Sequence, residues 1–382
     1  MDGGVELPFD EPNRLGSFLL VADTKRRYDD TAICLQLPQP ESERQPMFEP
    51  VDLILVGIEF DIHSSLYVIH TVNATTFRCS ERHNRHKRFG LNFTELWTFW
   101  MPFTLDGFDL DRFVAATLAE DLGHPPRDVT SESVIPADAR FAGVMDSRDA
   151  IVVAGLPIAE AFFRSLDPSI TIELLATEGQ PVPAGTDLMR LTGNARALLT
   201  AERSALNTVQ HLSGIATMTR AYVDAIAGTG CTLLDTRKTI PGLRVLEKYA
   251  TRMGGATNHR MGLWDAAMIK DNHVAVAGSV AEAPRRAVAA GIAKVIVEVD
   301  RIDQITEALD AGATHILLDN MAPPMLREAV ALIGTRTVTE ASGGVRLDTI
   351  RAIAETGVTY VSVGRLTQSA PAADVGLDFA LA

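Results

Sequence analysis

A strand–helix repeat in the C-terminal half limits the folds that are open to this chain. Short apolar runs, separated by segments of helical character, recur at a spacing of roughly twenty-odd residues. Each run ends in charged side chains or in glycine, and the runs span residues 233–238, 256–260, 266–270, 294–298, 315–319, 337–344 and 360–364. This alternation predicts parallel strands joined by crossover helices, which close into a barrel whose strands all end at one mouth.

That mouth would gather five basic side chains and two carboxylates: Arg237, Lys238, His259, Arg260, Lys270, Glu298 and Asp319. Charges are costly to bury without partners, so strand ends that carry several of them usually mark a site. Taken singly, each has a structural interpretation: Asp235 could brace a turn, and Lys270 could be a solvated loop charge. Taken together, the seven suit a substrate with several negative charges and a divalent metal ion.

Small residues follow the last two runs. Ser342-Gly343-Gly344 closes one of them, and Gly364 closes the other. In such barrels the loops at these strand ends commonly bind phosphate, because small residues let backbone N–H groups approach the phosphate oxygens. The sequence therefore predicts a phosphate site there, and it leaves open the role of Glu340 on the penultimate run.

Composition and missing motifs exclude several classes of protein. The 382-residue chain carries a net charge of −14, which argues against nucleic-acid binding as its main role. It has neither a G-x-x-x-x-G-K-[ST] loop nor G-x-G-x-x-G after a first strand, so P-loop and Rossmann proteins are disfavoured. No apolar run is as long as a membrane helix, the start lacks a basic secretory signal, and the three cysteines show no C-x-x-C spacing. We therefore expect a cytoplasmic protein that does not contact the membrane.

Residues 105–212 follow a different pattern, which is typical of an α/β sandwich. Helices are expected at residues 111–123 and 158–166, a polar loop at 128–132, and strands at 139–145, 150–154, 170–175 and 187–192. A long helical stretch runs from residue 195 to about residue 227, and Gly214 is expected to break it. The pattern alone makes Arg203, inside this stretch, a charge on the helix surface. A further helix is expected at residues 244–252.

Residues 1–104 differ from both of these parts. They hold short strand-like runs between proline-rich polar stretches, and a basic cluster at residues 82–88. The cluster could bind an anion or a metal through His83 and His86, but charge runs are usually solvated. The segment could also be an accessory module, or an over-extended start with Met101 as the working first residue. We expect instead a poorly ordered extension.

Longer motifs run through both regular parts in order and nearly without gaps. They are residues 119–123, 199–207, 212–217, 234–239, 258–263, 269–273, 318–321 and 340–344. By these motifs, residues from about 107 to 381 resemble the quinolinate phosphoribosyltransferase family. Motifs of this length in this order are far more specific than any short pattern.

The resemblance implies an α/β fold with two domains. An N-terminal α/β sandwich at residues 105–212, joined again by residues from about 370 to 382, precedes an incomplete (TIM-like) α/β barrel at residues 213–369. The resemblance also implies at least a homodimer, with a hexamer left open, in which each site is completed by the neighbouring subunit. Arg203 then becomes a substrate-binding residue that reaches across the interface.

The implied reaction joins quinolinate to phosphoribosyl pyrophosphate and gives nicotinate mononucleotide, pyrophosphate and CO2 in de novo NAD biosynthesis. A cage of cations would bind quinolinate: Arg203, Arg237, His259, Arg260 and Lys270. Lys238, Glu298 and Asp319 would be the catalytic residues. Glu298 and Asp319 would hold Mg²⁺ and the ribose hydroxyls, and would oppose the positive charge that develops at the anomeric carbon. Ser342, Gly343 and Gly364 would hold the 5′-phosphate.

Two positions depart from the family's pattern. Gln368 stands where many relatives carry His, and Arg365 stands where a small residue is usual. Arg365 could contact phosphate or form an outward salt bridge. Two other functions stay open: a paralogue that acts on another pyridine carboxylate, and a non-catalytic barrel that binds a phosphorylated ligand. The pair Glu298 and Asp319 argues against the second, because a binding protein has little need of metal ligands that stabilise a cation.

Overall fold

The structure is a computed structural model, and it describes residues 19–22, 33–36, 58–60, 67–69 and 103–381. The chain divides into two units, Met1–Met101 and Pro102–Ala382. In the first unit, β1 (Leu19–Ala22) pairs antiparallel with β2 (Ile33–Gln36), and β3 (Ile58–Phe60) pairs antiparallel with β4 (Tyr67–Ile69). The basic cluster at residues 82–88, and most of the extension that we expected to be poorly ordered, lie outside the described residues.

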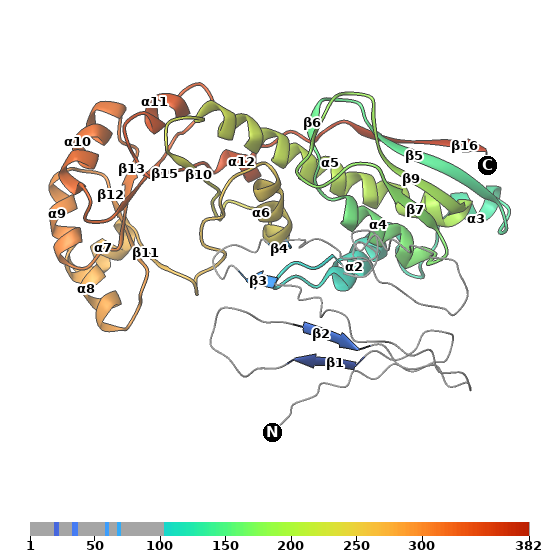
Figure 1. Ribbon diagram of the computed structural model, residues 1–382, viewed down its shortest axis with the longest axis horizontal. Helices are drawn as coiled ribbons and strands as arrows, with labels where there is room; N and C mark the ends of the chain where they lie inside the picture. The colour runs from blue at the N-terminus through green and yellow to red at the C-terminus, as the bar shows by residue number, and fades with distance from the viewer. Residues whose placement is uncertain (1–18, 23–32, 37–57, 61–66, 70–102, 382) are drawn as a thin grey trace, which may run out of the picture. The chain divides into compact units, whose positions relative to one another are not determined.

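Six parallel strands form one sheet of the second unit, at the left in Figure 1. In pairing order they are β10 (Thr232–Leu234), β15 (Tyr360–Ser362), β14 (Val338–Ser342), β13 (His315–Asp319), β12 (Val295–Val299) and β11 (Ala267–Ile269). Strands β10 and β11 are the two edges, so the barrel is open between them within the described residues. The predicted incomplete α/β barrel is confirmed.

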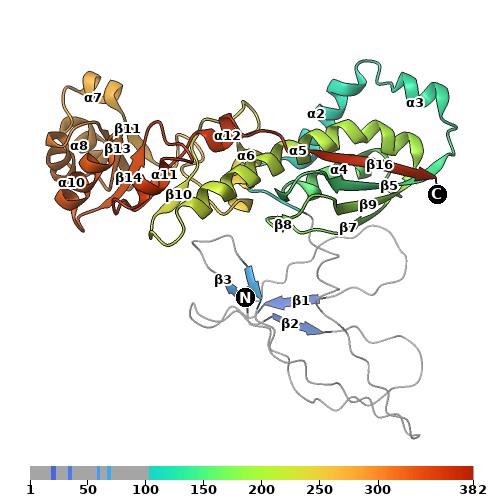
Figure 2. The same cartoon turned by 90° about the horizontal axis from the view of Figure 1, so that it is seen from above.

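Burial on both faces explains why these strands read as continuous apolar runs. Val295, Ile296 and Val297 of β12 are fully buried, and so are Ile316 and Leu318 of β13. Helices cover the outer face of the sheet in Figures 1 and 2: α8 (Glu282–Ala289), α9 (Asp303–Asp310), α10 (Pro323–Ile333) and α11 (Ile350–Ala354). Helix α7 (Asp271–Ala277) packs against α8. Because the six strands are parallel, their carboxyl ends share one edge of the sheet, where the charged residues were predicted to meet.

One strand of the predicted repeat is not formed. The prediction of a strand at residues 256–260 is wrong, because only a single bridge, between Leu234 and Thr257, links this segment to the sheet. The segment follows helix α6 (Arg244–Met253), which agrees with the helix expected at 244–252. The N–H of His259 and the side-chain amide of Asn258 donate hydrogen bonds to the Asp235 carboxylate. One backbone bridge at Thr257 and the side-chain hydrogen bonds to Asp235 together hold the segment.

The second sheet is antiparallel and lies at the opposite end of this unit in Figure 1. It pairs β16 (Val375–Leu381), β5 (Arg140–Ser147), β9 (Thr186–Asn194) and β7 (Thr171–Leu174) in that order, with β6 (Ile151–Val152) and β8 (Pro181–Val182) paired separately. Helices α2 (Leu110–Leu122) and α4 (Leu156–Leu166) pack with it, and Phe162 and Phe163 of α4 are fully buried in its core. Strand β16 brings the C-terminus back beside β5 after the barrel.

Helix α5 (Ala195–Ala225) packs against α4 and β6 on the sandwich side and against α6 and β10 on the barrel side. The prediction that Gly214 breaks this helix is wrong. A Cβ atom at position 214 would lie 2.0 Å from the carbonyl oxygen of Pro371. The glycine therefore leaves room for the segment between α12 (Arg365–Gln368) and β16, which packs directly against α5 at this point. At 31 residues α5 is long enough to cross a membrane but not apolar enough, and no other described helix qualifies.

A third correction concerns residues 128–132, for which the sequence predicts a polar loop. They begin helix α3 (Val129–Val134). The Oδ1 atom of Asp128 accepts a hydrogen bond of 2.9 Å from the N–H of Ser131 and caps the helix. Small polar residues are as typical of a helix N-terminus as of a loop, and here the cap decides between the two.

Candidate active site

A cavity of about 920 Å³ opens at the carboxyl ends of the parallel strands. Ten of the predicted site residues line it: Arg237, Lys238, His259, Arg260, Lys270, Glu298, Asp319, Ser342, Gly343 and Gly364. Eight of them come from the end of a barrel strand or from the loop that follows, as parallel strands with a common direction require. His259 and Arg260 come from the segment after α6. The remaining predicted residue, Arg203, lines a different cavity.

Two guanidinium groups face this cavity, close enough to affect one another. Burial and the like charge of Arg237 both lower the pKa of Arg260. The Nη1 atom of Arg260 donates to the Ala266 carbonyl over 3.1 Å. The Nε atom of Arg237 is buried and makes no hydrogen bond to any described residue. Two cations that repel each other, one with an unused donor, form a site that an anion with several negative charges would stabilise.

The two predicted metal ligands come from neighbouring strands, Glu298 from β12 and Asp319 from the end of β13. The Nζ atom of Lys270 lies 2.5 Å from Oε2 of Glu298, and Asp319 accepts a 2.6 Å hydrogen bond from the side-chain amide of Asn320. Within the described residues, no three His, Cys, Asp or Glu side chains gather to hold a metal ion. Two carboxylates fit an Mg²⁺ that arrives with a phosphate substrate, because Mg²⁺ keeps waters and substrate oxygens among its ligands.

The small-residue turn ties the end of β14 to the end of β13. Gly343 has a φ of 93°, and a Cβ atom there would lie 2.2 Å from Oδ1 of Asn320. Asn320 is itself left-handed, with a φ of 53°, and its N–H donates to the Ser342 carbonyl over 2.9 Å. Position 343 therefore requires glycine. The turn lines the cavity, and its contact with phosphate stays a prediction.

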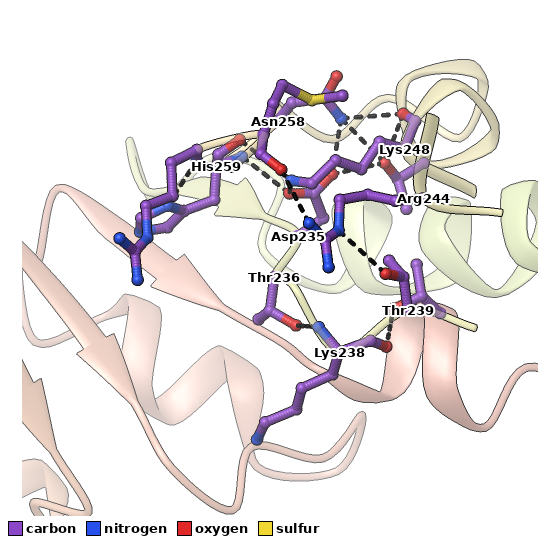
Figure 3. Close-up of polar contacts among 12 residues, drawn as sticks. Asp235, Thr236, Lys238, Thr239, Arg244, Lys248, Asn258 and His259 are labelled. Carbon is purple, nitrogen blue, oxygen red and sulfur yellow. Dashed lines mark hydrogen bonds and ion pairs between the residues drawn. The ribbon is translucent and has the colours of Figure 1, made fainter. Parts of the chain in front are cut away.

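The side chain of Lys238 passes directly beside Gly364, where a Cβ atom would lie 2.6 Å from the lysine Cδ. The Lys238 carbonyl accepts a 2.8 Å hydrogen bond from the Thr367 hydroxyl, so α12 fixes the backbone of this lysine. In Figure 3 the Lys238 side chain extends away from Asp235. Arg365 and Gln368, which depart from the family pattern, are on α12 and line the same cavity. This position favours a phosphate contact by Arg365 over an outward salt bridge.

His259 is buried at the edge of the cavity and is held at both ring nitrogens. Its Nδ1 accepts a 2.7 Å hydrogen bond from the N–H of Arg260, and its Nε2 lies 3.1 Å from Oε2 of Glu340, which places the ring proton on Nε2. The Nε2 atom of His315 lies 2.9 Å from the same oxygen, although it is not aligned for a hydrogen bond. Burial raises the pKa of Glu340, but the two histidines outweigh it and lower the pKa to about 2. Glu340 is therefore a fixed negative charge beside the cations.

Asp235 braces the turn after β10. This is the structural role that the sequence pattern left open for it. It is fully buried and pairs with the Lys248 ammonium from α6, which is also fully buried (Figure 3). Burial lowers the pKa of Lys248, and the charge of Asp235 opposes that shift. Neither residue lines the cavity, so the pair supports the site from behind.

Arg203 is exposed on α5 and does not line the larger cavity. It lines a second cavity, of about 240 Å³, together with Asn207, His211 and Ile240. Within one chain it is therefore absent from the lining of the larger cavity. This position is compatible with a reach across a subunit interface, which stays a prediction.

Arg346 and Asn320 also line the larger cavity, although the sequence pattern predicts no role for them. Arg346 stands two residues after the Gly343-Gly344 turn, and Asn320 directly follows Asp319, so adjacency to a predicted site residue could have identified both. His315 could not be found in this way. It opens a buried apolar strand, and nothing in the pattern separates it from the core.

Two family models match most of the second unit. The model of the quinolinate phosphoribosyl transferase N-terminal domain matches residues 128–213, and that of the C-terminal domain matches residues 215–378. The chain is 41% identical over 291 residues to the chloroplastic nicotinate-nucleotide pyrophosphorylase (carboxylating) of Oryza sativa, which covers 71% of this chain and 77% of the rice protein. It is 43% identical over 274 residues to the probable enzyme of that name from Synechocystis, which covers 70% of this chain and 92% of that protein.

Solved structures agree with these matches. The nicotinate-nucleotide pyrophosphorylase of Francisella tularensis aligns with a TM-score of 0.68 at 38% identity, over 71% of this chain and 96% of that one. The enzyme of that name from Ehrlichia chaffeensis aligns with a TM-score of 0.69 at 36% identity, over 72% of this chain and 100% of that one. The chain belongs to the quinolinate phosphoribosyltransferase family.

Proposed function

We propose that this chain transfers the phosphoribosyl group of phosphoribosyl pyrophosphate to quinolinate, and that it releases pyrophosphate and CO2 and forms nicotinate mononucleotide for NAD biosynthesis. The observation that carries this function is the pair Arg237 and Arg260, two guanidinium groups that repel each other in one cavity. The adjacent carboxylates of quinolinate supply two negative charges, and a guanidinium binds a carboxylate bidentately. Relatives named for the carboxylating enzyme support the same function.

The residues divide the chemistry between them. Arg237, Arg260 and Lys270 bind and orient the dicarboxylate, and Lys238 places its charge toward the phosphates. As pyrophosphate leaves, positive charge develops at the anomeric carbon, and Glu298 and Asp319 oppose that charge. Once the ring nitrogen is quaternised, it stabilises the carbanion that CO2 leaves behind. Decarboxylation therefore needs no separate general acid to begin.

Mg²⁺ is the metal that we propose for this site, held by Glu298 and Asp319 together with the phosphate substrate. When bound, it neutralises charge on the departing pyrophosphate. Lys270 pairs with Glu298 over 2.5 Å, so one of the cations that we propose for quinolinate contacts one of the proposed metal ligands.

A homodimer at least is part of the proposal, in which Arg203 completes the neighbouring subunit's site. The position of Arg203 on a second cavity, outside the lining of the larger one, supports it. A cytoplasmic location is also proposed. The names of plant relatives carry the words chloroplastic or mitochondrial, so fractionation of cells that express the full chain is the measurement that tests the compartment.

The reaction is tested with purified protein, phosphoribosyl pyrophosphate and Mg²⁺. Nicotinate mononucleotide and CO2 are followed with quinolinate in one tube and with nicotinate in another. Product from quinolinate alone is the expected result. Product from nicotinate would favour a paralogue that reads one carboxylate. Metal-independent binding of a phosphorylated ligand without product in either tube would favour the non-catalytic barrel.

A further inference from the structure

Helix α6 carries three charged side chains on one face. Arg244, Glu247 and Lys248 stand at i, i+3 and i+4, a spacing that places side chains beside one another on a helix. Glu247 and Lys248 are fully buried, and none of the three lines the larger cavity. Buried charges persist only where partners compensate for lost hydration, so their partners show what they do.

Lys248 and Asp235 hold the segment that carries His259 and Arg260. The Lys248 ammonium donates to Asp235 Oδ1 and, over 3.0 Å, to the His259 carbonyl. The N–H of His259 donates to the same Asp235 oxygen over 2.8 Å. The N–H of His259 is thereby fixed to Asp235, which stands two positions before Arg237, and the His259 carbonyl is fixed to Lys248, the ion-pair partner of Asp235. The pair joins the two segments that carry the guanidinium groups.

The second oxygen of the Asp235 carboxylate also accepts hydrogen bonds, and Figure 3 labels one of the donors, Asn258. Asn258 Nδ2 donates to Asp235 Oδ2 over 2.6 Å, and Thr251 Oγ1 donates to it over 3.0 Å. Thr251 belongs to α6, one turn after Lys248. With four donors on its two oxygens, Asp235 has a single well-defined orientation.

The other two charges of α6 bind the same two segments further along. Arg244 Nε donates to Thr239 Oγ1 over 3.2 Å, and its Nη1 donates to the Met261 carbonyl over 3.3 Å. Glu247 Oε2 accepts a 3.1 Å hydrogen bond from the N–H of Ile240. Thr239 and Ile240 follow the first guanidinium in sequence, and Met261 follows the second. One helix face therefore connects both segments at several points.

We propose that this face of α6 sets the spacing between Arg237 and Arg260 and thereby makes the site selective for two adjacent carboxylates. Arg244 and Lys248 are its positioning residues. The guanidinium groups repel each other, so their segments need an external tie to stay at one spacing when no anion is bound. Since this inference concerns how the site recognises quinolinate, it rests on the proposed function.

Arg244→Met is the first variant, because Arg244 is only half-buried and its loss leaves no buried charge unpaired. The KM for quinolinate should rise about tenfold or more, since small displacements of binding groups have large effects, while the KM for phosphoribosyl pyrophosphate stays within about twofold. Thr251→Val removes one hydrogen bond to Asp235 and should raise the KM for quinolinate about three- to tenfold. Thr251→Ser keeps the hydroxyl and should restore it. In both weakened variants the preference for quinolinate over nicotinate, measured as a ratio of Kd values, should fall.

Tyr249→Phe is the matched control on the same helix. Tyr249 donates to Glu178 over 2.6 Å, on the sandwich side and away from the cavity, so this variant should lose stability without a change in the KM for quinolinate. If the wild-type protein does not turn over quinolinate, the proposed function itself fails. If it does, and Arg244→Met keeps the wild-type KM, the inference is overturned. Equal rises in both KM values, matched by Tyr249→Phe, would reduce α6 to a structural helix and overturn it as well.

Discussion

A Cβ atom on Gly364 would lie 2.6 Å from Cδ of Lys238 and 3.4 Å from its Nζ, so the glycine makes room for the lysine. Gly364 has a φ of −72°, which any residue adopts, and only the flexible lysine side chain stands in the way. Gly364→Ala should therefore displace Lys238 without unfolding the protein. We expect kcat/KM for phosphoribosyl pyrophosphate to fall about tenfold, with a Tm close to that of the wild type.

Lys238→Ala provides the control for this prediction through a double-mutant cycle. If Gly364→Ala acts by displacing the lysine, it should add little to the loss of activity in the Lys238→Ala background. An undiminished effect in that background would show that the new methyl group interferes with the substrate directly.

Gly214→Ala should destabilise the protein, although alanine is the better helix former. The new Cβ atom would meet the carbonyl oxygen of Pro371 at 2.0 Å, and backbone cannot yield as a side chain can. We expect the free energy of unfolding, from urea titration, to fall by about 1–3 kcal/mol. An exposed helical glycine would give the opposite sign, a gain of up to about 1 kcal/mol, so the direction alone decides.

Gly214 also shows where sequence reasoning stops. The barrel was predictable because apolar runs and strand-end charges are local features, and parallel topology then gathers those charges without further information. The close passage of residue 371 beside Gly214 is a long-range contact, and no local pattern reveals it. The same holds for Lys248, whose partner Asp235 is found only by folding α6 back onto β10. The segment at 256–260 forms a single bridge to β10, and beyond it hydrogen bonds to the Asp235 side chain hold Asn258 and His259.

Glu340 should make stability depend on pH on the acid side. Its pKa is about 2 in the folded protein, below the ordinary value of 4.5, because the adjacent His259 and His315 side chains outweigh burial. A carboxyl group with a lowered folded pKa stabilises fully above its unfolded pKa and loses that contribution as pH falls through the folded pKa. The difference between the folded and ordinary pKa of Glu340 corresponds to a contribution to the free energy of unfolding on the order of 3 kcal/mol. The difference in unfolding free energy between wild type and Glu340→Gln should shrink as pH falls from 4.5 toward 2. A difference that is constant with pH would contradict this account.

Removal of divalent metal should abolish turnover and leave the fold intact. Three carboxylates line the cavity, and one of them, Glu340, is paired with His259 and His315. Glu298 and Asp319 remain, and the described residues form no three-ligand metal site, so the metal should bind with the phosphate substrate rather than with the protein alone. EDTA should therefore leave the Tm of the ligand-free protein unchanged and lower it only when phosphoribosyl pyrophosphate is present. Mg²⁺ should restore both stabilisation and activity. A fall in the Tm of the ligand-free protein on chelation would point to a resident metal instead.

Arg203 gives the sharpest test of the proposed dimer, because it lines a different cavity from Lys238 within one chain. If Arg203 completes the neighbouring subunit's site, Arg203→Ala and Lys238→Ala should each be inactive alone. In a mixed dimer of the two variants, one site carries both losses and the other carries neither. Random mixing of equal amounts should then recover about one quarter of the wild-type activity, since half of the dimers are mixed and half of their sites are intact. If both residues serve the same chain's site, every site keeps one loss and mixing recovers nothing.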